Sequence, residues 1–105
     1  MTCDTYRIVM RAPLGNRSGK LTLCIDGDEL SGIIEILGHC NEFHHGTLRA
    51  GHCQFAGEIK TLLRSISYSA EGCVGQGSVS LQMHTKRDVL PVSGQLDTED
   101  SEERS

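Results

Sequence analysis

Apolar and polar residues alternate along almost the whole chain, and this alternation constrains the fold more than any other feature. In a strand, successive side chains point to opposite faces of the sheet, whereas a helix would scatter the same residues around its circumference. Seven segments place apolar or small side chains at every second position: Tyr6/Ile8/Met10, Leu21/Leu23/Ile25, Ile34/Ile36, Phe55/Gly57/Ile59, Ile66/Tyr68/Ala70, Val79/Leu81/Met83 and Leu90/Val92/Gly94. We therefore predict an all-β chain.

A glycine followed two residues later by Leu or Ile recurs along the chain. Gly19, Gly32, Gly46 and Gly57 are separated by 13, 14 and 11 residues, about the length of one strand and one turn. Such spacing is typical of a meander of hairpins, in which glycines let strongly coiled strands pass close together. We predict eight strands, centred on residues 4–11, 19–26, 30–38, 44–49, 53–60, 65–71, 77–84 and 89–96.

Eight short strands must hide their edges, and closure into a barrel is the simplest way to do so. We therefore predict an eight-stranded antiparallel meander barrel, with a two-sheet β-sandwich as the alternative. The predicted inner face carries about eighteen large apolar side chains, close to the number that fills a barrel of this size. This filling argues against a roomy internal cavity.

The charge of the chain is concentrated at its end. Residues 97–105 contain five acidic residues and one arginine, which leaves nine acidic and nine basic residues in residues 1–96. We predict a single barrel domain over residues 1–96 and a disordered acidic tail over residues 97–105. Because the body of the chain is neutral, a nucleic acid is not expected as a partner.

The five cysteines form an odd set without a short CxxC pair. Such a set is typical of reduced thiols in a cytosol, so we expect no structural disulfide. The chain shows no signal-peptide pattern and no run of about 20 apolar residues that could cross a bilayer. We therefore expect a cytoplasmic protein that does not associate with membranes.

Histidines and cysteines cluster between residues 39 and 53, a composition that suits zinc. A strand over residues 44–49 would separate His52 and Cys53 from the others by roughly 17–20 Å, beyond the reach of one ion. The remaining candidate metal ligands are His39, Cys40 and either His44 or His45, with His39 and His44 facing each other across a hairpin. The alternative interpretation is a set of polar turn residues beside a half-buried thiol.

The meander with periodic glycines resembles the avidin and lipocalin kind of barrel. The segments Ala12-Pro13-Leu14-Gly15 and Gly38-His39-Cys40-Asn41-Glu42-Phe43 resemble those of small uncharacterised bacterial β-barrel proteins. The resemblance spans residues 4–96 at the level of architecture, and it implies a fold that often binds small molecules. The chain contains no tryptophan, so no ligand-binding residue of those families is carried over.

We expect a cytoplasmic module that binds a small molecule or assembles with itself, and we assign no catalytic residues. A homo-oligomer is expected because apolar side chains remain on the predicted outer face, at Val9, Ile33, Leu37 and Leu63. Two alternatives remain open. One is a metal-binding protein that uses the turn at residues 39–45, and the other is a small barrel enzyme with a pocket at one mouth, built from Tyr6, Tyr68 or Arg64.

Overall fold

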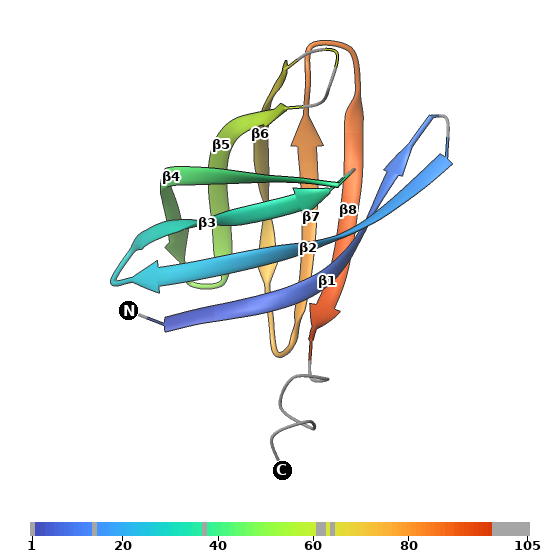
Figure 1. Ribbon diagram of the computed structural model, residues 1–105. Coiled ribbons are helices and arrows are strands. Elements are labelled where there is room, and N and C mark those ends of the chain that lie inside the picture. Colours follow the sequence, from blue (N-terminus) through green and yellow to red (C-terminus); the bar gives the residue numbers. More distant parts are fainter. Residues whose placement is uncertain (1, 14, 37, 61–62, 64, 98–105) are drawn as a thin grey trace.

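The computed structural model of the chain is an all-β meander that closes into an eight-stranded antiparallel barrel (Figure 1). It describes residues 2–13, 15–36, 38–60, 63 and 65–97. The strands are β1 (Thr2–Ala12), β2 (Gly15–Asp26), β3 (Glu29–Ile36), β4 (His39–Arg49), β5 (His52–Lys60), β6 (Ser65–Val74), β7 (Ser78–His84) and β8 (Val89–Leu96). Each strand pairs with its neighbours in the sequence, and β1 pairs with β8. The predicted barrel is therefore confirmed.

The barrel has two parts whose strands cross at a steep angle. Figure 1 shows β2, β3 and the first half of β4 running across β5, β6 and β7. The change of direction falls within β4, which bends near its middle and then runs beside β5. This bend is the feature of the fold that creates the candidate site described below.

The interior is filled by the side chains that the alternation predicted. Leu21, Ile34 and Met83 have no exposed surface, and most of the other apolar side chains of the predicted inner face are also buried. Phe43 and Leu30 join this core, while Ile25 and Leu90 are only partly buried against it. Because a buried Leu or Ile truncated to Ala typically costs about 2–5 kcal/mol, the core supplies much of the stability.

Glycines allow neighbouring strands to approach closely, as their spacing predicted. Gly32 lies so near the backbone of Thr22 on β2 that a Cβ atom there would overlap the Thr22 carbonyl oxygen. The same Cβ would also lie 2.9 Å from the Phe43 ring, which packs over the glycine. The small residue therefore serves both the strand contact and the aromatic packing beside it.

Several strand boundaries differ from the prediction, and two of the differences fall where the sequence is typical of a turn. The predicted strand over residues 44–49 starts earlier, because β4 already begins at His39, and Gly38 takes the positive φ of 77° that the preceding turn requires. The predicted strand over residues 65–71 ends later, since β6 continues to Val74. In both places a residue typical of turns lies inside a strand, because tertiary packing overrides its local preference.

The prediction that no disulfide forms is wrong. Cys3 and Cys24 face each other directly in the β1–β2 ladder and form a disulfide. Residues 2–5 of β1 pair with β2 but not with β8, so the bond fastens a two-stranded extension of the barrel. The prediction failed because the odd number of cysteines was taken as a sign of free thiols. The pairing of Cys3 with Cys24 depends on the register of the two strands, which the cysteine count does not show.

The final strand is anchored at Asp97, which the prediction placed in the disordered tail. The Asp97 N–H donates to the Thr5 carbonyl at 2.9 Å. Its carboxylate, only 4% exposed, lies 3.7 Å from both the Arg7 Nε and Lys20 Nζ atoms. Asp97 is thus part of the described barrel, and the rest of the predicted tail, residues 98–105, lies outside the described residues.

The disulfide predicts the outcome of thiol titration. Without reductant, Cys40 and Cys73 should react rapidly with a thiol reagent because both are exposed, and Cys53 should react only on unfolding because it is buried. Cys3 and Cys24 should react only after reduction. Mass spectrometry of the labelled protein would count the modified residues. Four or more labelled cysteines in the unfolded but unreduced protein would contradict the disulfide.

Candidate functional site

The β4–β5 pair has the shortest ladder of the barrel. Only three residue pairs form its ladder, Thr47–Gln54, Leu48–Cys53 and Arg49–His52, all beside the connecting turn. Beyond them, residues 39–43 of β4 pair only with β3, and residues 55–60 of β5 pair only with β6. We call the interval between these two segments the seam.

A bulge in β4 opens the seam. The β3–β4 register shifts by one residue between the pairs Leu30–Gly46 and Gly32–Phe43. The extra residue lies at His44 and His45, and His45 has a φ of 63°, an unusual value for a residue with a side chain. Because a bulge bends its strand, β4 turns away from the direction of β5 at this point.

Both edges of the seam present backbone polar groups. On β5, the Lys60 N–H points into the seam, and by the period of two the N–H and C=O groups of Ala56 and Glu58 point the same way. On β3, the Asp26–Glu29 hairpin fixes which backbone groups point to β2, and it follows that those of Ile34 point to β4. Because Ile34 pairs with Asn41, the backbone groups of Asn41 point back to β3. The backbone groups that β4 turns toward β5 therefore belong to Cys40, Glu42 and His44.

Aromatic rings close the seam on the inner side. The rings of Phe43 on β4 and Phe55 on β5 are stacked, with centroids 4.1 Å apart and planes inclined by 18°. Tyr68 on β6 meets the Phe55 ring edge to face at 6.2 Å. β4 and β5 approach closely here, since a Cβ atom on Gly57 would lie 3.4 Å from the Phe43 Cβ. Packing of the aromatic rings thus takes the place of the missing ladder.

Asn41 bridges the seam with one half of its amide. Its Oδ1 accepts a hydrogen bond from the Lys60 backbone N–H at 3.2 Å. Its Nδ2 is buried and has no hydrogen-bond partner, and the residue as a whole is only 9% exposed. An unpaired buried amide costs on the order of 1–3 kcal/mol, so this group is a candidate for binding an acceptor atom.

The Tyr68 hydroxyl is a second buried polar group without a partner. It lies at the seam, because a Cβ atom on the neighbouring Gly57 would be 3.1 Å from the hydroxyl oxygen. Burial raises the pKa of Tyr68 to about 12. The hydroxyl therefore keeps its proton at neutral pH and is available as a hydrogen-bond donor.

The outer side of the seam is a groove of about 770 Å³. Its walls include Glu42 and His44 on β4 and Glu58 and Lys60 on β5, and Asn41, Phe43 and Gly57 also line it. This volume lies within the range of about 300–1,000 Å³ that is usual for small-ligand sites. The seam thus combines backbone groups outside the β4–β5 ladder, two buried side-chain donors without a partner, and space for a ligand on its outer side.

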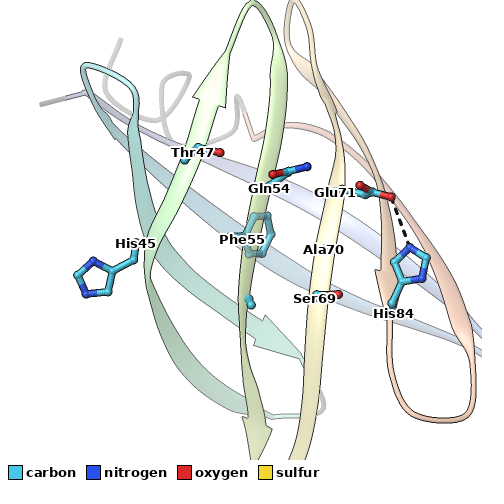
Figure 2. Close-up of a pocket in the computed structure, with 9 residues that line it drawn as sticks. His45, Thr47, Gln54, Phe55, Ser69, Ala70, Glu71 and His84 are labelled. Atoms are coloured by element: carbon cyan, nitrogen blue, oxygen red, sulfur yellow. Dashed lines mark ion pairs between the residues drawn. The ribbon is translucent and has the colours of Figure 1, made fainter.

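A second, shallow depression of about 550 Å³ adjoins the groove, since His45 and Ala56 line both. Figure 2 shows its polar side chains on the outer face of β4 to β7, with His45 pointing away from the others. His84 Nε2 lies 3.6 Å from Glu71 Oε1, and both side chains are about half exposed. This depression offers polar contacts but, among the described residues, no buried group that lacks a partner.

The four predicted metal ligands all lie on β4. His39 is the first residue of this strand, so the expected approach of His39 and His44 across a hairpin is wrong. Cys40 and His44 are four residues apart on one strand, or roughly 14 Å. Among the described residues, no group of three or more His, Cys, Asp or Glu side chains could hold a metal ion.

Cys40 has a different partner. Its thiol donates to Glu35 Oε2 at 3.2 Å, and this hydrogen bond raises the pKa of the thiol. A metal would need the thiolate, which this environment disfavours. His44 lies 3.8 Å from Glu42, and its ring centroid is 6.3 Å from that of His45. Zinc binding stays a prediction that metal analysis of the purified protein can decide.

In the alternative prediction of a small barrel enzyme, three residues were candidates for a pocket at one mouth of the barrel. Tyr6 and Tyr68 are both buried in the core, and Arg64 lies outside the described residues. Burial raises the pKa of Tyr6 as well. Tyr68 therefore belongs to the candidate site, but in the wall of the barrel rather than at its mouth.

Sequence reasoning missed Asn41, because an asparagine beside cysteine and glutamate is typical of a turn. The available signal was the alternation of Asn41 and Phe43 with the polar residues Cys40, Glu42 and His44. That alternation predicts a strand with asparagine on its inner face. A polar residue at such a position is a stronger functional hint than an exposed histidine.

Comparisons of the chain with protein-family models, with curated proteins and with solved structures found no match. By its fold and its site, the protein is a small antiparallel β-barrel with an open seam in its wall.

The unpartnered hydroxyl predicts that Tyr68→Phe stabilises the protein. Removing a buried hydroxyl without a hydrogen bond should raise the free energy of unfolding by about 1 kcal/mol, because its desolvation cost disappears. Urea denaturation would measure the change. The control is Tyr6→Phe, which removes the hydroxyl of the other buried tyrosine. A loss of stability in Tyr68→Phe would show that the hydroxyl has a partner.

The raised pKa values predict a loss of stability at high pH. Tyr68 titrates near its ordinary value of 10.0 when unfolded and near 12 when folded, so above about pH 10 the unfolded state binds fewer protons. Cys53, whose pKa burial raises from 9.0 to about 11, acts in the same direction. The free energy of unfolding should therefore fall between about pH 9 and 12. In Tyr68→Phe the fall should be smaller; an equal fall would contradict this assignment.

Proposed function

We propose that this protein is a non-catalytic binding module whose ligand occupies the β4–β5 seam. The observation that carries the proposal is the burial of two unpartnered polar groups, Asn41 Nδ2 and the Tyr68 hydroxyl, beside the same break in the sheet. Buried polar groups in folded proteins nearly always have partners, and orphaned ones call for an explanation such as a missing ligand. A ligand in the seam supplies that explanation.

The two groups also indicate the chemistry of the ligand. An amide nitrogen is purely a donor, and a protonated phenol donates while its oxygen can also accept. The ligand should therefore carry acceptor oxygens, such as those of an amide, a lactam or an alcohol. Glu42 and Glu58 on the walls disfavour an anion, although Lys60 lies at one end of the groove. The stacked rings of Phe43 and Phe55 favour an apolar portion beside these oxygens.

Two of the apolar side chains expected to promote a homo-oligomer, Val9 and Ile33, lie apart from each other on the surface of the barrel. Val9 and Ile33 are 37% and 39% exposed. Their neighbours on β2, Ser18 and Thr22, are four residues or roughly 14 Å apart. Leu63 is exposed, and Leu37 lies outside the described residues. Self-association stays a prediction, which native mass spectrometry can test.

The cytoplasmic location also stays a prediction. In the described part of the chain, no helix is long and apolar enough to cross a membrane. The Cys3–Cys24 disulfide weighs against a reducing compartment, since structural disulfides persist mainly in oxidising ones. Trapping of free thiols in intact cells would report the redox state of this pair.

A fragment screen tests the proposed function. Ligand-observed NMR with a library of neutral amides, lactams and alcohols should find fragments that bind the wild-type protein. In protein-observed spectra, these fragments should shift the amide signals of Gly57 and Lys60. Tyr68→Phe should raise their Kd by about tenfold, the equivalent of one hydrogen bond worth about 1.4 kcal/mol.

Tyr6→Phe is the matched control, because Tyr6 is the other buried tyrosine and lies on β1, which pairs with β2 and β8 and not with the strands of the seam. It should leave the affinity of the fragments unchanged. Fragments that bind elsewhere, or that bind Tyr68→Phe as tightly as the wild type, would count against the seam as the binding site.

A further inference from the structure

The two edges of the seam carry backbone groups at the spacing of a strand. Cys40, Glu42 and His44 face it from β4, and Ala56, Glu58 and Lys60 face it from β5. Each edge therefore repeats a donor and an acceptor every second residue, about 6.8 Å apart. Of these groups, the Lys60 N–H bonds to the Asn41 side chain. This repeat matches the backbone of an extended peptide.

We propose that the natural occupant of the seam is an extended peptide segment that adds as a strand between β4 and β5. The inference rests on the proposed function, because it names the ligand class for the same site. Addition of a peptide strand to exposed sheet edges is a recurring mode of recognition in which backbone hydrogen bonds supply affinity. Here both edges belong to one barrel, so the bound peptide completes the β4–β5 junction.

The side chains around the seam define the peptide further. Outward-facing residues of an inserted strand lie beside Glu42 and Glu58, which favour lysine or arginine there. Inward-facing residues meet Phe43 and Phe55, which favour apolar side chains. The segment Cys40–His44 accommodates about five residues of partner strand. The expected ligand is a short peptide that alternates basic and apolar residues.

Insertion requires the seam to widen. The bond between Asn41 Oδ1 and the Lys60 N–H must break, and the Phe43–Phe55 stack must part, because a Cβ atom on Gly57 would now lie only 3.4 Å from the Phe43 Cβ. Peptide backbone groups then take over both partners of the broken hydrogen bond. Asn41 can then also use its free Nδ2 to bond a peptide carbonyl. Because three ladder pairs hold β4 and β5 together at the turn, the strands separate only over the part that is already unpaired.

The test uses a phage library of random linear dodecapeptides, panned on the wild-type protein. Peptides with alternating basic and apolar residues should be enriched, and synthetic copies should shift the amide signals of Ala56 and Glu58. Methylation of alternate backbone nitrogens of the peptide should weaken binding at least tenfold in each of the two phases, because each phase removes the donors to one of the two edges without changing the protein.

Glu58→Pro is the informative protein variant. Its lost N–H faces the seam and not β6, so the β5–β6 ladder remains, but binding should fall at least tenfold. Glu58→Gln removes only the charge and should have a smaller effect, and Ala56→Pro provides a second backbone variant if Glu58→Pro does not fold. Circular dichroism checks the fold of each variant.

Three outcomes would overturn the inference. One is enrichment of no peptide on the wild-type protein over Glu58→Pro, and another is binding that alternate N-methylation leaves unchanged in either phase. The third is a wild-type dimer that Glu58→Pro dissociates, which would make a second copy the occupant. If neutral fragments still bind in a Tyr68-dependent way, the proposed function stands while the peptide inference fails.

Discussion

A closed barrel satisfies its backbone only if each strand forms a ladder with both neighbours, and this requirement fails between β4 and β5. The bulge at His44 and His45 bends β4 into the crossing direction and leaves part of each edge without a ladder. What holds the wall together there is one hydrogen bond from the Lys60 backbone to Asn41 and the stack of Phe43 on Phe55. The placement of the groove, the orphaned donors and the aromatic floor all follow from this local failure of pairing.

The site has a stability cost that the rest of the barrel offsets. An unpartnered amide and an unpartnered hydroxyl inside the wall each disfavour the folded state by on the order of 1–3 kcal/mol. A filled core and seven extended ladders supply the compensation elsewhere. Natural proteins tolerate such groups mainly where function requires them, which is why these two atoms are more informative than the exposed histidines.

The sequence predicts the barrel well because its main signal, alternation with a period of two, is local and is repeated in every strand. Glycine spacing adds the strand length and the close approaches, as at Gly32. The seam was not predictable in the same way, since it depends on the register of β4 against two neighbours. A buried asparagine resembles a turn residue in a linear reading, and so β4 was expected to begin at residue 44. The Cys3–Cys24 disulfide was missed for a related reason, because pairing across strands depends on register and not on spacing along the chain.

The most direct measurement of the open seam is amide hydrogen exchange, followed residue by residue by NMR. Along β5, the amides of Gly57 and Ile59 point to β6, and those of Ala56 and Glu58 point to the seam. The account predicts slow exchange for the first pair and fast exchange for the second in the free protein. Equal protection of all four amides would mean that β4 and β5 form a continuous ladder, and it would contradict the seam.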